Sequence, residues 1–204
     1  AGETLNTFVS DKWDVTDTIG NMDLSSTTYL LDQSLSKSMG YHRFKWDMRH
    51  LGPWDVRDRR TYKNGPQVSS GAYRVKLTVG ETVSIQNFTL HTDPRILSSG
   101  VTEAEIQKQE ELGLKLVKLL TEVRKYIYGL EQEKKSAKGA RLVEIQAQLA
   151  SFVMEKGIYM QPKIINQIEY LYASINGSDQ LPSRDAYARF IALKSLVESE
   201  KSQN

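Results

Sequence analysis

The chain has 204 residues; 39% of them are hydrophobic, 25% are charged, and the formal net charge is +2. These proportions predict a folded protein and exclude an intrinsically disordered one. The balanced charge gives no reason to expect nucleic acid as a partner. The lack of cysteine excludes disulfides and thiolate metal sites. No apolar run approaches the roughly 20 residues of a membrane-spanning helix, so we expect no membrane span.

The composition changes near residue 100. Before that point Trp, Thr, Tyr, Ser, Gly and Pro are common, and apolar residues recur with a period of two. After it Glu, Lys, Gln, Leu, Ile and Ala dominate, and the period is close to 3.6. Strands followed by helices predict an α+β protein in two segregated parts. We therefore expect an antiparallel β-sandwich in residues 1–98 and an antiparallel four-helix bundle in residues 99–204.

The first seventy residues give the weakest pattern. Leu5–Val9 and Thr28–Leu31 are candidates for short strands, separated by a polar stretch that contains Trp13. Residues 50–70 are predicted to form a long loop, because Gly-Pro pairs interrupt them.

The clearest strands lie between residues 41 and 91. In Tyr41–Arg49 and again in Ala72–Val79, apolar and polar residues alternate, which is typical of an antiparallel sheet with one buried face. Gly80-Glu81 then predicts a type II′ hairpin turn, because Gly adopts a positive φ without steric cost. The returning strand changes parity at Gln86-Asn87, and a β-bulge there would restore its inward face.

The helical half begins at a strong start signal. Thr102 is followed three residues later by Glu105, the pattern of a capping box, and the apolar spacing then carries a helix to about Lys135. A second helix is predicted at Leu142–Val153. The third helix is predicted to have Pro162 in its first turn, and Ser183 is predicted to cap the fourth. Four amphipathic helices with short connections favour an antiparallel bundle.

Two motifs carry a resemblance to a known family. The segment Gly40–Trp54 has the sequence GYHRFKWDMRHLGPW, and the segment from Gly71 to Val79 has the form G-x-Y-x-V-x-L-x-V. Together they resemble the C-terminal region of bacterial sortilin-like or BNR/Asp-box propeller proteins, often labelled glycosyl hydrolases. Thr92–Arg95 and Gln161–Lys163 also match that family's pattern.

The resemblance implies an immunoglobulin-like sandwich, similar to the flagellar hook-capping type, followed by a helical appendage. The family's sandwich usually begins with one strand more than this chain has. The first strand is therefore either lost or supplied by another segment, and such an open sheet edge invites strand addition. The resemblance also implies an exported bacterial parent whose propeller domain carries any catalytic chemistry. Because no initiator Met or signal peptide is present, we expect a processed or excised piece.

No catalytic constellation emerges from the sequence. His42, His50 and His91 are predicted to be partly exposed strand residues, since no G-x-S-x-G turn and no zinc-ligand spacing accompany them. We therefore predict no catalytic residue, no metal site and no cofactor. Aromatic residues in loops can stack on sugar rings or contact a partner. The candidates for ligand or partner contact are Trp13, Trp54 and Tyr62; the alternative for the tryptophans is to cover the end of the sandwich.

These observations favour a non-catalytic structural or interaction module. Its expected partners are the propeller domain of the same parent and another protein or strand at the open sheet edge. Two alternatives remain: a glycan- or protein-binding accessory module, and a part of a glycoside hydrolase whose active site lies in the propeller. The predicted location is outside the cytoplasm, in the periplasm, on the cell surface or secreted.

Overall fold

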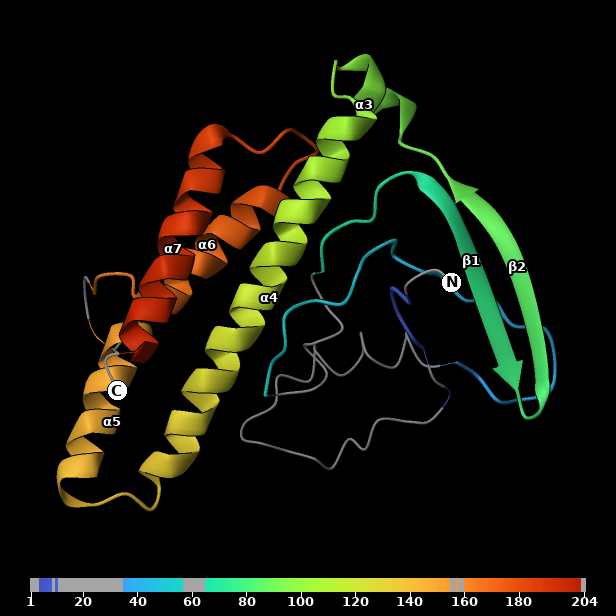
Figure 1. Ribbon diagram of the computed structural model, residues 1–204. Coiled ribbons are helices and arrows are strands. Elements are labelled where there is room, and N and C mark those ends of the chain that lie inside the picture. Colours follow the sequence, from blue (N-terminus) through green and yellow to red (C-terminus); the bar gives the residue numbers. More distant parts are fainter. Residues whose placement is uncertain are drawn as a thin grey trace.

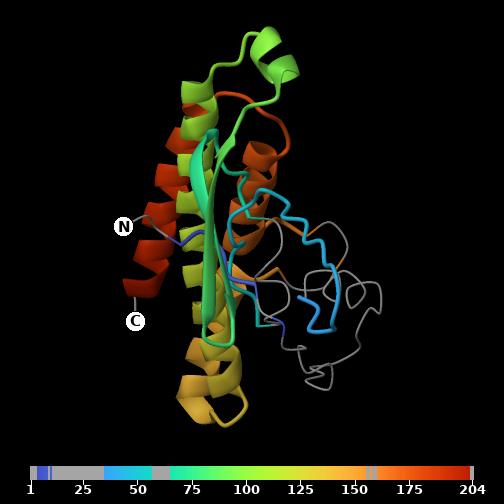
Figure 2. The same ribbon diagram turned by 90° about the vertical axis from the view of Figure 1, so that its right-hand side faces the viewer.

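The computed structural model describes residues 4–8, 10, 35–56, 65–154, 157 and 160–202. In chain order, the elements are β1 (Gly71–Val79), β2 (Thr82–Leu90), α3 (Pro94–Ser98), α4 (Glu103–Lys134), α5 (Gly139–Phe152), α6 (Ile164–Asn176) and α7 (Arg184–Ser202). Figure 1 shows the β1–β2 hairpin on one side of α4 and the helices α6 and α7 on the other. Viewed from the hairpin side, β1 and β2 run lengthwise in front of α4 (Figure 2).

The long helix α4 begins at the predicted capping box. The Thr102 side chain accepts a hydrogen bond from the Glu105 amide (3.3 Å), and the Glu105 carboxylate accepts one from the Thr102 amide (2.8 Å). These bonds satisfy amides that the first turn of a helix leaves unpaired. The helix then runs for 32 residues, or about 48 Å, as the apolar spacing predicts.

The core lies between one face of α4 and the three helices that follow it. It is built mainly from Leu, Ile and Val side chains at helical spacing. Its buried members are Leu112, Leu116, Leu119, Leu120, Val123, Ile127, Phe152, Ile164, Ile168, Leu171, Tyr172, Ile175, Ala186, Leu193 and Val197.

The predicted four-helix bundle is wrong, because α5, α6 and α7 pack at different levels of α4. α4 contacts α6 through Arg124, which pairs with Glu169 (2.8 Å), and α7 through Glu122, which pairs with Lys201 (2.6 Å). Further along, Glu133 pairs with Arg141 of α5 (2.7 Å). A helix of 32 residues is more than twice as long as α5, with 14, or α6, with 13. The shorter helices therefore pack against different parts of its length.

The hairpin has the predicted two-residue turn. Val79 faces Thr82 across Gly80-Glu81, and Gly80 has a φ of +57° whereas Glu81 does not have a positive φ, as a type II′ turn requires. The predicted bulge at Gln86-Asn87 is wrong, because the register continues without interruption from Val79↔Thr82 to Gly71↔Leu90. As a result, the apolar residues of β2 are divided between the two faces of the hairpin.

The predicted sandwich, immunoglobulin-like or otherwise, is also wrong. The described residues contain one sheet of two strands, and Tyr41–Arg49 is not a strand. Met48 has a φ of +57°, in the left-handed region, so an extended chain cannot continue through it. Leu5–Phe8 has no strand either, and the rest of the first two strand predictions, Val9 and Thr28–Leu31, lies outside the described residues.

Within this segment, Trp46 contacts the hairpin through its ring and not through its backbone. The Trp46 ring lies edge-on to Tyr73 (6.1 Å between centroids) and to Phe88 (6.4 Å), whereas Phe44 contacts Phe8 (4.6 Å). Trp46 therefore covers the base of one hairpin face, and side chains nearer the turn remain exposed. Of the helices in the described ranges, none combines the length and apolar character that crossing a bilayer requires.

A single glutamine joins α4 to the turn between α6 and α7. The Gln109 side-chain amide donates to the carbonyls of Ile175 and Ser178 (2.5 Å each) and accepts from the Gln180 amide (3.2 Å). We expect Gln109→Ala to lower the free energy of unfolding by about 1–3 kcal/mol, because it leaves three backbone groups unpaired. Gln107→Ala, at an exposed position on the same helix, should change it little. Chemical denaturation measures both, and equal losses would contradict the assignment.

Candidate functional site

Two loop segments, residues 48–54 and 65–69, pack together against α4; we call them the paired loops. The His50 amide donates to the Pro66 carbonyl and the Val68 amide donates to the Met48 carbonyl, both at 2.9 Å. Arg49 faces Gln67 as an isolated antiparallel bridge between the two segments. Val68 is 3% exposed. The region predicted to be a long loop is therefore ordered and partly buried where the structure describes it.

The paired loops contact a face of α4 that adjoins the face used by the helical core. Glu110, Gly113, Thr121, Arg124 and Tyr128 recur at a spacing that places them on one face of the helix. The core residues of α4 lie on the adjoining face, and Arg124 borders both faces because it also pairs with Glu169 of α6. The helix therefore has two packing faces, one apolar and one largely polar.

Glu110 is the centre of the first polar contact. One carboxylate oxygen, Oε2, accepts hydrogen bonds from the Ser69 amide (3.1 Å) and the Ser69 hydroxyl (2.5 Å). The other oxygen, Oε1, is hydrogen-bonded to His50 Nε2. The Tyr73 hydroxyl, at the start of β1, donates to the Ser69 carbonyl (2.6 Å). One carboxylate thus joins both paired loops to α4 next to the base of the hairpin.

The surroundings of Glu110 favour its charged form. Burial alone raises the pKa of its carboxyl, but the hydrogen bonds from His50 and Ser69 outweigh that effect and hold the pKa below its usual value. Burial, followed by the nearby negative charge of Glu110, raises the pKa of Tyr73. The side chains of His50 and Glu110 are only 11% and 16% exposed. The cluster is therefore a partly buried, charge-assisted contact.

Ser69, His50 and Glu110 are the residue types of a hydrolase triad, but they are not arranged as in a triad. In a triad the histidine lies between the nucleophile and the acid and removes the nucleophile's proton. Here Glu110 lies in the middle, and the Ser69 hydroxyl donates to it. A carboxylate only accepts hydrogen bonds, so His50 Nε2 carries its proton toward Glu110 and is not available as a base for Ser69.

Trp54 anchors the far end of the paired loops. Its amide donates to the Thr121 hydroxyl (3.0 Å), and its carbonyl accepts from Arg124 (3.3 Å). Its ring lies edge-on to Tyr128 (5.7 Å), with the Lys125 ammonium 5.9 Å from the ring centroid. Trp54 therefore packs along α4. The other two predicted contact residues, Trp13 and Tyr62, lie outside the described residues.

A shallow hollow lies beside the Glu110 cluster. Its lining includes Arg49, Gln109, Glu110 and Asp179. Arg49 donates to the Gly65 carbonyl (2.9 Å), and Gln109 holds the α6–α7 turn, so these polar groups already have intramolecular partners. Across the residues that the structure describes, no group of three or more His, Asp or Glu side chains could hold a metal ion.

The chain was compared with known families, proteins and structures. No protein-family model, no curated protein and no solved structure matches the chain.

The roles of Glu110 and Ser69 were not predicted from the sequence, and His50 was predicted to be a partly exposed strand residue. One signal was present. Glu110 follows the apolar residue Ile106 by four positions and precedes Gly113 by three, so a charge and a glycine share one face of a helix. Such a face indicates a second packing surface.

We expect Glu110→Gln to lower the free energy of unfolding by roughly 1–3 kcal/mol at neutral pH, because charge-assisted hydrogen bonds are lost. The pKa of Glu110 is lowered in the folded protein, so its stabilising effect is fully present above its usual value of 4.5. It disappears as the pH falls below that value through the folded pKa. Denaturation curves of both proteins from pH 7 to pH 3 should therefore converge at the acidic end.

The exposed neighbour on the same helix provides the control. Glu111→Gln should leave the unfolding free energy nearly unchanged at every pH. A pH-independent gap between wild type and Glu110→Gln would mean that the carboxylate does not hold the paired loops by its charge.

Two glycines of α4 test the contact with the paired loops. A Cβ at Gly113 would lie 2.9 Å from Pro66 Cγ and 3.0 Å from Pro66 Cβ, whereas a Cβ at Gly129 would meet nothing within 4 Å. Gly129→Ala should stabilise the protein by about 0.5–1 kcal/mol, the usual gain within a helix. Gly113→Ala should be less stable than wild type, because the clash with Pro66 outweighs the gain in helix stability. If both substitutions stabilise equally in thermal unfolding, Pro66 does not pack on α4.

Proposed function

We propose that this chain is a non-catalytic structural and interaction module of an exported bacterial propeller protein. The observation that carries the proposal is the state of the hairpin: its base is anchored to α4 through Tyr73, Ser69 and Glu110, while five of its apolar side chains are at least half exposed. Val75 and Leu77 are 53% and 52% exposed. Groups of this kind, clustered on one element, are typical of a surface that binds another protein.

The chemistry of the Glu110 cluster supports a structural role. Its hydroxyl, imidazole and carboxylate groups are hydrogen-bonded to one another and so hold the paired loops. A glycosidase needs two carboxylates on either side of a cleft. Both oxygens of Glu110 are already hydrogen-bonded, and Asp179 lies in a shallow hollow. This pair is therefore unsuited to act as the acid and the second carboxylate of a glycosidase.

The propeller domain of the same parent is the proposed partner. Support comes from the position of the two motif segments: Gly40–Trp54 contacts the hairpin through Trp46 and ends in the paired loops, and Gly71–Val79 forms β1. A glycan-binding role has less support, because the ring of Trp54 packs against Tyr128 and Lys125.

The proposal predicts binding without turnover. Co-expressed with the propeller domain of its parent, the chain should co-elute with it in gel filtration and unfold at a higher temperature, because a partner stabilises the state that it binds. Purified 1–204 should hydrolyse aryl glycosides, esters and peptides no faster than Ser69→Ala or His50→Gln does. A parent without a propeller, or turnover that these substitutions abolish, would refute the proposal.

A further inference from the structure

Along the outer edge of β1 lies a row of backbone groups that have no partner strand in the described part of the chain. In a hairpin closed by a two-residue turn, the pair next to the turn exchanges hydrogen bonds, and every second pair along the strands does the same. Starting from Val79↔Thr82, the residues of β1 between these pairs are Ala72, Arg74, Lys76 and Thr78. Their amides and carbonyls point away from β2. Within the described residues, no backbone hydrogen bond reaches them from another segment.

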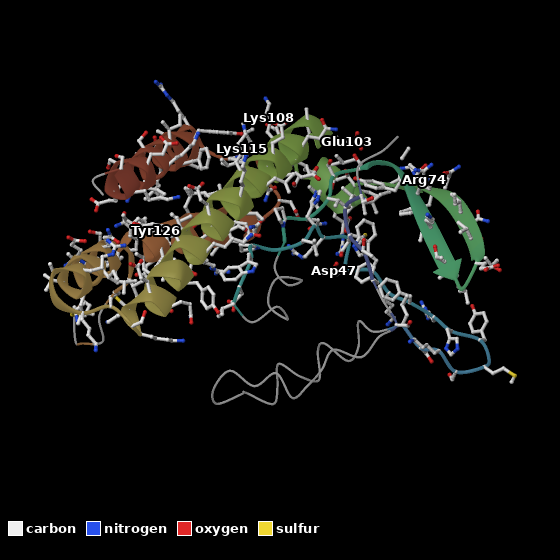
Figure 3. The ribbon with its side chains drawn as sticks, turned by 60° about the horizontal axis from the view of Figure 1, so that its bottom comes forward. Asp47, Arg74, Glu103, Lys108, Lys115 and Tyr126 are labelled. Atoms are coloured by element: carbon white, nitrogen blue, oxygen red, sulfur yellow. The ribbon has the colours of Figure 1, made fainter. Side chains whose placement is uncertain are left out.

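The two faces of β1 differ sharply in chemistry. Val75, Leu77 and Val79 lie on one face and are 53%, 52% and 66% exposed. Arg74 and Lys76 lie on the other face and are also exposed. Figure 3 shows Arg74 on the hairpin, clear of the helices, whereas Tyr126 lies among them. No ion pair among the described residues neutralises either cation. A strand laid along this edge would therefore meet a row of apolar side chains on one face and two positive charges on the other.

We infer that the outer edge of β1 binds an extended protein segment in which apolar and acidic residues alternate, and that this segment adds to the hairpin as a third strand. Its apolar residues would lie beside Val75 and Leu77, and its acidic residues beside Arg74 and Lys76. Backbone bonding along an edge gives affinity in such additions, and alternate side chains give selectivity. This inference rests on the proposed interaction role and names the partner's chemistry.

The other edge of the hairpin is a poorer site. On β2 the backbone groups that point away from β1 belong to Val83, Ile85, Asn87 and Thr89, whose side chains share one face of the hairpin. On the other face, β2 carries the side chains of Thr82, Ser84 and Gln86 beside the turn. This edge offers neither a continuous apolar row nor a charge. The selectivity for acidic residues is therefore confined to the β1 edge.

A second copy of the chain is a worse partner than an acidic segment. If β1 paired with β1 of another copy, Arg74 and Lys76 would face the same cations, and like charges opposite one another destabilise a strand pair. Nucleic acid also fits less well, because five half-exposed Val, Leu and Ile side chains on the hairpin outnumber its two cations. Both remain outcomes of the test.

Two proline substitutions separate strand addition from other modes of binding. Proline removes an amide and is tolerated in a strand only where that amide faces outward. Thr78→Pro removes an outward amide from the β1 edge, and Thr89→Pro removes one from the β2 edge; both threonines lie on the same face of the hairpin. Each should leave the hairpin intact, which the unchanged thermal unfolding of the whole chain would verify.

The probe is a labelled nine-residue peptide of alternating Val and Glu, with a peptide of alternating Val and Lys as its matched control. In fluorescence anisotropy the Glu peptide should bind wild type, and Thr78→Pro should weaken that binding by about tenfold, since backbone bonds are lost. Thr89→Pro should change it by less than about twofold. The double substitution Arg74→Glu, Lys76→Glu should reverse the preference so that the Lys peptide binds better.

Several results would overturn the inference. These are equal effects of the two prolines, no preference between the two peptides, or displacement of the Glu peptide by single-stranded DNA. A concentration-dependent dimer in light scattering that Thr78→Pro dissolves would assign the edge to a second copy. If the Glu peptide fails to bind while the propeller domain still co-elutes, this inference falls and the proposed function stands. If the Glu peptide binds but no propeller partner is found, strand addition at the β1 edge stands and the proposed function falls.

Discussion

The carboxylate of Glu110 is the contact on which the arrangement of the molecule depends. It accepts hydrogen bonds from both paired loops, and through Ser69 it reaches Tyr73 at the start of β1. The hairpin makes few other contacts with the helical part. A single charged group, partly buried and well bonded, thus fixes where a whole element projects from the protein. Both oxygens must be satisfied for this to stabilise the fold, because a buried carboxylate without partners is costly.

The second constraint is the length of α4. Because it is longer than its neighbours, it takes part in three packing arrangements: with α6 and α7, with α5 near its C-terminal end, and with the paired loops on an adjoining face. Arg124 contributes to two of these, since it pairs with Glu169 of α6 and also donates to the Trp54 carbonyl. One side chain of α4 therefore links the helical core to the paired loops.

Local patterns predicted local structure well. The capping box at Thr102, the Ser183 cap and the turn at Gly80-Glu81 were confirmed, because each depends on neighbouring residues only. The sandwich and the four-helix bundle failed because they depend on which segments meet. Apolar and polar residues do alternate in Tyr41–Arg49, yet Trp46 packs its ring on the hairpin without backbone pairing. The Glu110 contact joins residues 41 and 60 positions apart, which no periodicity reveals. The division into residues 1–98 and 99–204 stays a prediction.

The position of the hairpin before α4 in the chain has a consequence for biogenesis. Glu110, Gly113 and Thr121 face the paired loops together only after that part of the chain has become helical. A ribosome synthesises β1 and β2 first, so the hairpin emerges before its anchor exists. During that interval its Val, Leu and Ile side chains and both strand edges are open to any neighbouring polypeptide, the condition under which nascent chains aggregate or recruit chaperones.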